Sequence, residues 1–285
     1  MHKFLGFSSE SIIELEEIAV PINECTKVTL GLPSQKIIEI LERNNFDQAL
    51  VKSDKAILGI VTTKRLKELL KFNKKLTSTD LGIKIKEIYT PCSFDNLLGF
   101  FSNDSFGLVV ASLNGGEYGE SEFVKGLITI SDLNKHYFRS VIYIYLLQLE
   151  VLLADIISGF FQDSWEWIKQ MNENRMVRIL GYYELSKKRN VEINPIESCT
   201  LTDLLNIVSK NKSLLTRLGF HSRNIFEKHI NHIPELRNSI MHPIKPLITK
   251  RDDIKWLRDT MNNIFKLGAC LENLKQLATK VKSRK

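Results

Sequence analysis

The chain has 285 residues, of which 43% are hydrophobic, so two domains with buried cores are expected and a disordered protein is excluded. The net charge of +7 is uneven: residues 1–138 carry 16 Lys and Arg against 18 Asp and Glu, and residues 139–285 carry 24 against 15. A basic second half is typical of a domain that meets a polyanion, although a basic surface tuned for solubility gives the same pattern. The four cysteines stand at no metal-site or redox spacing, and the first residues lack the basic-then-apolar order of a signal peptide, so we expect reduced thiols and a cytoplasmic protein.

The first half of the chain contains an internal repeat. Residues 34–66 and 93–133 share one predicted order of elements, which is helix, strand, hairpin, strand and helix. Ser34 and Ser93 are predicted helix N-caps, and a short apolar strand begins 15 residues after each of them. The hairpin is longer by eight residues in the second copy, where it covers residues 112–124.

Each copy ends in a pattern of Gly, two apolar residues, Thr, two variable residues, Asp and an apolar residue. Residues 126–133 match this pattern in full, and residues 59–66 match it except that Arg65 stands in place of Asp. The repeat therefore resembles a pair of CBS motifs, at about residues 18–72 and 81–138. The resemblance implies two α/β units that pack face to face and bind adenosine ligands in the clefts between them.

The resemblance also implies roles for particular residues of the second copy. By position, Asp132 would bind the ribose of an adenosine ligand, Thr129 the phosphate, and the backbone near Thr90 to Cys92 the base. A carboxylate can accept hydrogen bonds from both ribose hydroxyls, which explains why this position is acidic. An ordinary helix cap explains Asp132 equally well.

In the first copy, Thr62 and Arg65 occupy the corresponding positions. Arg65 cannot accept a hydrogen bond from ribose. We expect this first cleft to be either empty or reoriented towards phosphates.

From residue 139 onward the apolar residues recur with helical spacing. A run at 141–161 is almost long enough to span a membrane, but Gln148, Glu150 and Asp155 interrupt it, which favours a core helix of a soluble bundle without a membrane partner. Further helices are predicted at about 164–188, 200–210, 222–241 with a reset at Pro234, and 252–280. With an all-α domain at 141–285 after a CBS pair at 1–140, the predicted fold class is α+β.

One motif stands out in the helical part. Arg237 and Asn238 are followed, after three variable residues, by His242 and then Pro243. Late in a helical domain, this pattern resembles the signature of HEPN domains, many of which cut RNA. The resemblance implies a homodimer in which the two motifs line one cleft.

The residue types of the motif suit metal-independent cleavage of RNA. Pro243 disfavours helical geometry at His242, so the imidazole is expected at a helix end, on the same face as Asn238. An imidazole can exchange a proton at neutral pH, and a guanidinium can stabilise the charge on a phosphorane. His242 is thus predicted as general acid or base and Arg237 as the charge-stabilising group, while Asn238 positions the phosphate or the imidazole.

Glu150 lies within an apolar run and would be costly to bury alone. By resemblance it pairs with Arg237, and the alternative is a solvent-facing Glu150 beside Gln148. His229 and His232 are spaced like metal ligands but lack a third partner, so we expect a surface pair and no metal site.

Together these features predict a nucleotide-regulated endoribonuclease whose partners are RNA, an adenine nucleotide such as AMP, ADP or ATP, and a second copy of the chain. No cofactor is required for cleavage. The HEPN resemblance implies a toxin-like or antiphage role. The alternative is a non-catalytic scaffold, in which the helical domain dimerises or binds RNA without cutting it.

Overall fold

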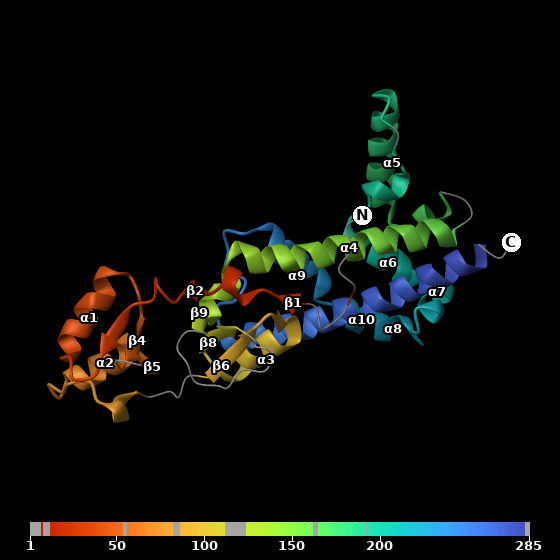
Figure 1. The fold of residues 1–285 in the computed structure, drawn as a ribbon. Coiled ribbons are helices and arrows are strands. Elements are labelled where there is room, and N and C mark those ends of the chain that lie inside the picture. Colours follow the sequence, from red (N-terminus) through yellow and green to blue (C-terminus); the bar gives the residue numbers. More distant parts are fainter. Residues whose placement is uncertain are drawn as a thin grey trace. The chain divides into compact units, whose positions relative to one another are not determined.

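The computed structural model describes residues 7, 12–53, 56–81, 86–111, 124–161, 165–191 and 193–282 (Figure 1). The chain divides into two compact units, Ile12–Tyr137 on the one hand and Phe138–Lys285 with Met1–Ser11 on the other. This division differs from the expected one, which placed residues 1–140 together. Phe7 joins the helical unit because its ring meets that of Tyr145, with 6.0 Å between the centroids.

The first unit contains the expected repeat, and each copy begins with an additional strand. The first copy consists of β3 (Lys27–Thr29), α1 (Ser34–Arg43), β4 (Gln48–Lys52), β5 (Ile57–Thr62) and α2 (Thr63–Leu70). The second copy consists of β6 (Lys86–Thr90), α3 (Phe94–Asn103), β8 (Phe106–Ala111), β9 (Val124–Thr129) and the 3-10 helix η4 (Ile130–Asn134). The longer hairpin predicted in this copy lies, at residues 112–123, outside the described residues.

The two copies form two sheets. In the first sheet the strand order is β3-β4-β5, and in the second it is β2-β9-β8-β6, where β2 is Val20–Pro21. The additional strands, β3 and β6, run parallel to β4 and β8, whereas β4 and β8 pair antiparallel with the strands that follow them. Apolar residues of both sheets share one core, among them Leu50, Ile60, Leu108 and Leu127. The first unit therefore contains two α/β units whose sheets pack on a common core, as the repeat predicts.

Shorter elements complete this unit. They are β1 (Ile12–Ile13), which pairs with β7 (Cys92–Ser93), and the 3-10 helices η1 (Leu15–Glu17) and η2 (Ser78–Asp80). The prediction of Ser93 as a helix N-cap is confirmed, because its hydroxyl accepts a hydrogen bond from the Asn96 amide at 3.2 Å. The prediction of Ser34 is wrong. Pro33 is the N-cap, and the Ser34 hydroxyl donates instead to the Lys74 carbonyl at 2.8 Å.

A close backbone approach explains why glycine begins the signature of the second copy. Gly126 pairs with Pro21 across β9 and β2, and a Cβ atom at this position would lie 2.5 Å from the Val20 carbonyl oxygen. In the first copy a Cβ atom at Gly59 would lie 3.1 Å from the Leu81 Cβ. The signature glycines thus allow neighbouring chain segments to pack against the sheets.

Every regular element described in the second unit is a helix, as expected for its all-α part. The helices are α4 (His136–Phe160), α5 (Glu173–Lys188), α6 (Leu201–Lys210), α7 (Lys212–Arg217), α8 (Arg223–Ile230), α9 (Ile233–Met241) and α10 (Arg251–Lys282), with 3-10 helices η5 (Glu166–Gln170) and η6 (Pro195–Ser198). One of the predicted helices is divided without having been expected to be: the helix at 164–188 is η5 followed by α5. The helix at 222–241 is interrupted between Ile230 and Ile233, close to the reset expected at Pro234.

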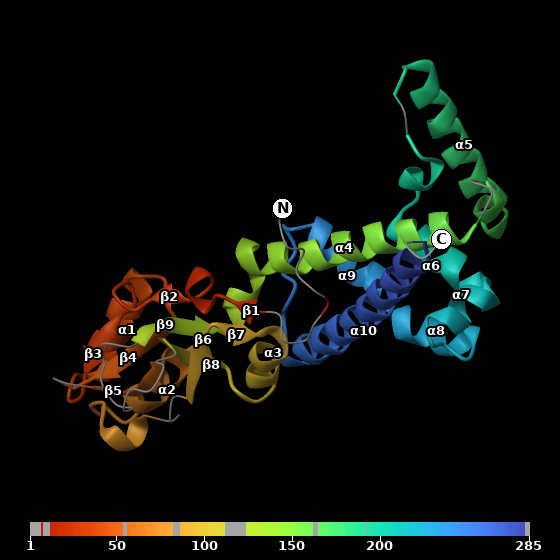
Figure 2. The same cartoon turned by 45° about the vertical axis from the view of Figure 1, so that its right-hand side comes forward.

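Helix α4 forms the centre of this unit and runs beside α10 (Figures 1 and 2). Nine of its residues are buried, and Tyr145 packs edge-on against Phe265 of α10 at 5.1 Å between centroids. By length and composition alone, α4 could also cross a membrane. In both views α5 projects away from the other helices of its unit (Figures 1 and 2).

Candidate functional sites

The carboxylate of Asp132 lies at the junction of β9 and η4, where it is 6% exposed. One oxygen, Oδ2, accepts hydrogen bonds from the amide and the hydroxyl of Thr129, at 2.7 and 2.8 Å. The other, Oδ1, faces the Lys135 ammonium at 2.9 Å. Asp132 is therefore part of a capping box begun by Thr129, and a ribose at Oδ1 would have to displace Lys135.

Thr90 does not share a cleft with Asp132. Across β8, Thr90 pairs with Ala111, whereas Thr129 pairs with Phe106 at the other end of that strand. At roughly 3.3 Å per residue these ends lie about 16 Å apart. The expectation that the backbone near Thr90 to Cys92 holds the base of a ligand bound to Asp132 is thus wrong.

Thr90 and Cys92 take part in local packing instead. The Thr90 hydroxyl accepts a hydrogen bond from the Leu15 amide at 3.1 Å, and Cys92 pairs with Ile13 in the two-stranded β1-β7 sheet. Burial raises the pKa of the Cys92 thiol to about 11, so it stays protonated at neutral pH. Both residues fasten the segment around Ile13 and Leu15 to the second copy.

Cys25 lies just before β3, the first strand of the first copy, and is close enough to Asp132 for the two groups to interact electrostatically. Burial raises the pKa of the Cys25 thiol, the Leu127 backbone opposes this, and the Asp132 carboxylate raises it further. The sequence pattern did not identify Cys25, because no motif marks it and only the packing of the two copies brings it close.

In the first copy, Thr62 is the N-cap of α2 and accepts a hydrogen bond from the Arg65 amide at 3.3 Å. The guanidinium of Arg65 pairs with Asp80 and Glu68, each at 3.1 Å. A hydrogen bond from the Thr77 hydroxyl, helped by Arg65, holds the pKa of Asp80 below its usual value. Because its charge is already paired with carboxylates, Arg65 favours the empty alternative for this cleft over the phosphate-binding one.

In the second unit, α9 carries the Arg-Asn-His motif. As expected from Pro243, the helix ends at His242, whose amide donates to the Asn238 carbonyl at 3.2 Å and whose ψ angle of 73° leaves helical geometry. The side chains of Asn238 and His242 are exposed, and within the described part of the chain neither of them makes a hydrogen bond. The imidazole is therefore open to solvent.

Arg237 turns towards a different neighbour. It is half-buried, and its charge acts on Glu150 of α4. Burial raises the pKa of Glu150, while Arg237 and the amide of Leu201, the first residue of α6, oppose this shift. Two residues earlier on α4, Oε1 of Gln148 is buried and, among the described residues, has no hydrogen-bond partner. This arrangement favours the pairing of Glu150 with Arg237 over the solvent-facing alternative.

The motif is divided between two sides of α9. Five positions separate Arg237 from His242, which corresponds to about 140° around a helix axis. Asn238 and His242, by contrast, share one face. One copy of the chain thus brings together Arg237 with Glu150, and Asn238 with His242.

His229 is not part of a surface pair as expected. Its Nε2 lies 2.9 Å from the Asn263 carbonyl oxygen of α10, and burial lowers the pKa of its ring. His232 instead faces Glu235 at 3.2 Å. Over the residues that the structure describes, His, Cys, Asp and Glu side chains form no group of three or more that could hold a metal ion.

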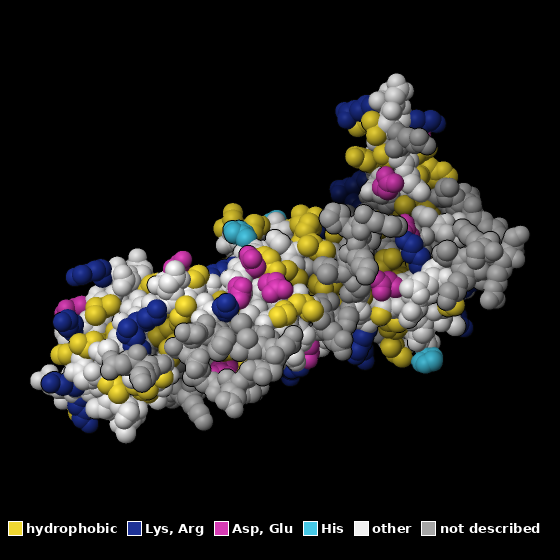
Figure 3. Space-filling view, viewed as in Figure 1, with side chains coloured by type: hydrophobic (Ala, Val, Ile, Leu, Met, Phe, Trp, Pro, Cys, Tyr) yellow, Lys and Arg dark blue, Asp and Glu magenta, His cyan; other side chains and the backbone are white. Residues whose placement is uncertain are grey.

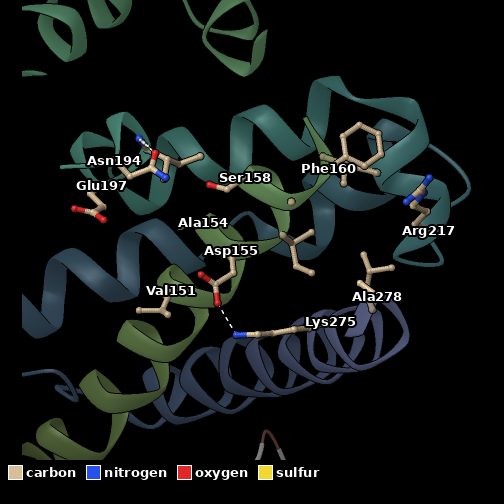
Figure 4. A pocket seen from close by; sticks show the side chains of 15 residues that line it. Val151, Ala154, Asp155, Ser158, Phe160, Asn194, Glu197, Arg217, Lys275 and Ala278 are labelled. Carbon is tan, nitrogen blue, oxygen red and sulfur yellow. Dashed lines mark hydrogen bonds and ion pairs between the residues drawn. The ribbon is translucent and has the colours of Figure 1, made fainter. Parts of the chain in front are cut away.

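A pocket of about 540 Å³ lies between α4, η6, α7 and α10 (Figure 4). An ion pair between Asp155 and Lys275, 2.5 Å long, joins α4 to α10 beside it, and the Arg217 guanidinium lies 5.1 Å from the centre of the Phe160 ring. None of the predicted site residues is among those that line it.

No protein-family model matches this chain, and no curated protein matches it in sequence. Several solved structures resemble part of it. They include a hemolysin-like CBS-domain protein of Oenococcus oeni (13% identity, 42% of this chain and 87% of that one, TM-score 0.36) and a CBS-domain pair with bound AMP from Klebsiella pneumoniae (18% identity, 46% and 98%, TM-score 0.34). A third is the CBS domain of a bacterial CNNM/CorC family Mg²⁺ transporter in complex with ATP (16% identity, 44% and 86%, TM-score 0.35).

Proposed function

We propose that this chain is a nucleotide-regulated, metal-independent endoribonuclease. The observation that carries the proposal is His242, an exposed imidazole at the end of α9 that shares a helix face with Asn238. Arg237 of the same helix interacts with Glu150 of α4. These groups suffice for RNA transesterification, in which the substrate supplies its own nucleophile.

The proposed reaction is an attack of the ribose 2′-oxygen on the adjacent phosphorus. Either His242 takes the 2′-hydroxyl proton and water protonates the departing 5′-oxygen, or water takes the first proton and protonated His242 supplies the second. Arg237 stabilises the added negative charge of the phosphorane, and Glu150 holds Arg237 in place. The P–O5′ bond breaks, which leaves a 2′,3′-cyclic phosphate and a 5′-hydroxyl.

A second copy of the chain completes the proposed site. Arg237 and His242 of one copy lie on different sides of α9, and two facing motifs would surround the phosphate from both. Apolar side chains of α4 that remain exposed by two-fifths or more support such an interface; they are Tyr143, Ile144, Leu147 and Val151. On α5, exposed apolar side chains lie between basic ones (Figure 3).

The regulatory part of the proposal concerns the cleft at Asp132. An adenosine ligand would take the place of Lys135 at Oδ1, while Oδ2 continues to cap η4. Calorimetry with AMP, ADP and ATP tests this assignment, with Asp132→Asn as the variant and Asp104→Asn as the control. Binding that Asp132→Asn leaves unaltered contradicts it.

The nuclease assignment is tested with total RNA in the presence of EDTA. We expect the wild-type chain to generate 2′,3′-cyclic phosphate ends and His242→Ala to reduce the rate by about 10²–10⁴-fold, the usual contribution of general acid–base catalysis. His221→Ala is the matched control, because His221 is also exposed but lies outside α9. We expect it to cleave at the wild-type rate.

The alternative is a scaffold that binds RNA without cutting it. If no second copy completes the site, the divided placement of Arg237 and His242 leaves only this alternative. If wild type and His242→Ala leave RNA equally intact, with and without AMP, ADP and ATP, the scaffold replaces the nuclease. A toxin-like or antiphage role follows from the HEPN resemblance and predicts that expression arrests growth only when His242 is present.

A further inference from the structure

Arg139 is a buried cation at the beginning of the helical unit. It lies in the first turn of α4 and is only 4% exposed. A fully buried arginine is rare because its five N–H donors must find partners inside the protein.

The guanidinium of Arg139 donates hydrogen bonds to one residue before His242 and to one residue after it. Nη1 donates to the Ser239 carbonyl at 3.1 Å, and Nη2 donates to the Lys245 carbonyl. Ser239 belongs to the last turn of α9, where the carbonyls have no partner within the helix. Lys245 lies in the segment that follows, so His242 stands between two points that a single side chain ties together.

A planar fork is well suited to making both bonds. Arginine presents parallel N–H groups at a fixed separation, whereas a lysine ammonium is a single point. Arg139→Lys therefore keeps the charge but holds one carbonyl instead of two. The residue thus fixes how the segment after α9 leaves the helix.

We infer that Arg139 is a positioning residue that fixes His242 and links it to the nucleotide cleft. The inference rests on the proposed function. Lys135, which pairs with Asp132, directly precedes α4, and Arg139 follows it by four residues. A ligand that displaces Lys135 from Asp132 changes the restraint on the first turn of α4, and Arg139 carries that change to both sides of His242.

The experiment measures amide hydrogen exchange in a peptide that covers residues 239–248. Arg139→Lys is compared with wild type and with Arg178→Lys, an exposed arginine on α5. We expect Arg139→Lys to accelerate exchange in this peptide by about tenfold or more, as the loss of one charge-assisted hydrogen bond implies. Arg178→Lys should leave exchange unchanged. AMP should alter exchange of the same peptide in wild type and not in Arg139→Lys.

Cleavage kinetics give a second readout. Arg139→Lys should lower kcat by about tenfold while KM changes by less than about twofold, since misplacing a catalytic group affects chemistry more than binding. If the peptide at residues 239–248 exchanges at the wild-type rate in Arg139→Lys, the positioning role is overturned, even if the protein cuts RNA. If exchange of the peptide is faster in Arg139→Lys but the wild-type chain never cuts RNA, the positioning role is retained and the nuclease function is rejected.

The exchange measurement with and without AMP needs only wild-type protein. It therefore tests the link between the nucleotide cleft and the segment around His242 even if Arg139→Lys does not fold. If AMP does not change the exchange rate at residues 239–248 of the wild-type chain, the link to the cleft is overturned, whether or not calorimetry detects binding.

Discussion

Glu150 is the acidic group whose surroundings conflict most with its charge. Burial raises its pKa, although Arg237 and the Leu201 amide favour the carboxylate. A raised pKa means that the folded chain holds this proton more tightly than the unfolded chain does. Stability is therefore greatest below the unfolded pKa of a glutamate, and part of it is lost as the pH rises through the folded pKa.

We predict that Glu150→Gln is stabilised relative to wild type at pH 7 and that this gain shrinks towards pH 4. A glutamine amide oxygen can still accept the Leu201 bond but carries no charge. Thermal unfolding across this pH range measures the gain, and Glu184→Gln on the exposed side of α5 is the control. A gain that does not change with pH would show that the charge of Glu150 is not the cause.

Sequence patterns located some of the site residues and not others, for physical reasons. Pro243 is enough to end a helix at His242, because proline restricts the residue before it. The proximity of Glu150 to Arg237 was expected from resemblance, and the structure places them together. Thr90 was assigned to the wrong end of its sheet, since its place depends on the pairing of β6 with β8, which no local pattern encodes.

At the scale of elements, Asp203 fastens α6 to α5. It forms a capping box with Thr200 and a two-pronged ion pair with Arg175. Burial opposes ionisation of Asp203, but hydrogen bonds from Arg175 and Thr200 outweigh it and hold the pKa below its usual value. The resulting stability is present above the unfolded pKa and is lost as the pH falls through the folded one.

We predict that Asp203→Ala destabilises the chain by about 2–4 kcal/mol, since it removes a cap and leaves Arg175 without its partner. Asp253→Ala is the matched control. Asp253 accepts hydrogen bonds from Thr249 and Lys250 at the start of α10. Its loss should cost only about 1 kcal/mol. Denaturant unfolding measures both, and equal losses would contradict the importance of the Arg175 pair.

The signature glycine of the second copy gives a further prediction. Gly126→Ala should destabilise the chain by about 1–3 kcal/mol, because the new methyl group meets the Val20 carbonyl at 2.5 Å. Gly181→Ala, on α5 with open space around it, should be neutral or stabilising by up to about 1 kcal/mol. Unfolding of both variants decides this, and a neutral Gly126→Ala would mean that β2 can move away from β9.

Strong periodicity made most elements predictable. All four strands of the repeat begin one or two residues before the expected ones, and the helices α4 and α10 were found from apolar spacing. The division of residues 164–188 into η5 and α5 was missed, although Asn172 caps α5 through the Arg175 amide at 3.0 Å. The cap residue had the right chemistry, but the apolar pattern continues across it.

At the scale of the whole molecule, the exposed face of α4 bears on assembly. We predict that the chain is a dimer in solution and that Leu147→Asp converts it to a monomer, since a charge in an apolar interface must be desolvated. Ile225→Asp is the control, because Ile225 of α8 is exposed to a similar degree, 51% against 45%. Sedimentation velocity distinguishes the outcomes. A monomeric wild type would contradict the proposed two-copy site.

The two-unit organisation was predictable in kind, because a repeat with strands precedes a purely helical pattern. The assignment of Met1–Ser11 to the helical unit was not predictable. Phe7 packs closely on Gly268 of α10, where a Cβ atom would lie 2.1 Å from the phenyl ring. This contact joins residues far apart in the sequence, and a single glycine in a helix gives no sign of it.

The most direct test of the account is the initial rate of RNA cleavage measured against AMP concentration for wild type, Asp132→Asn and His242→Ala. We expect wild type to cleave RNA at a rate that depends on AMP, Asp132→Asn to cleave at a rate independent of AMP, and His242→Ala to cleave about 10²–10⁴-fold more slowly than wild type. Intact RNA with wild type at every AMP concentration, or the same AMP dependence in Asp132→Asn, would contradict it.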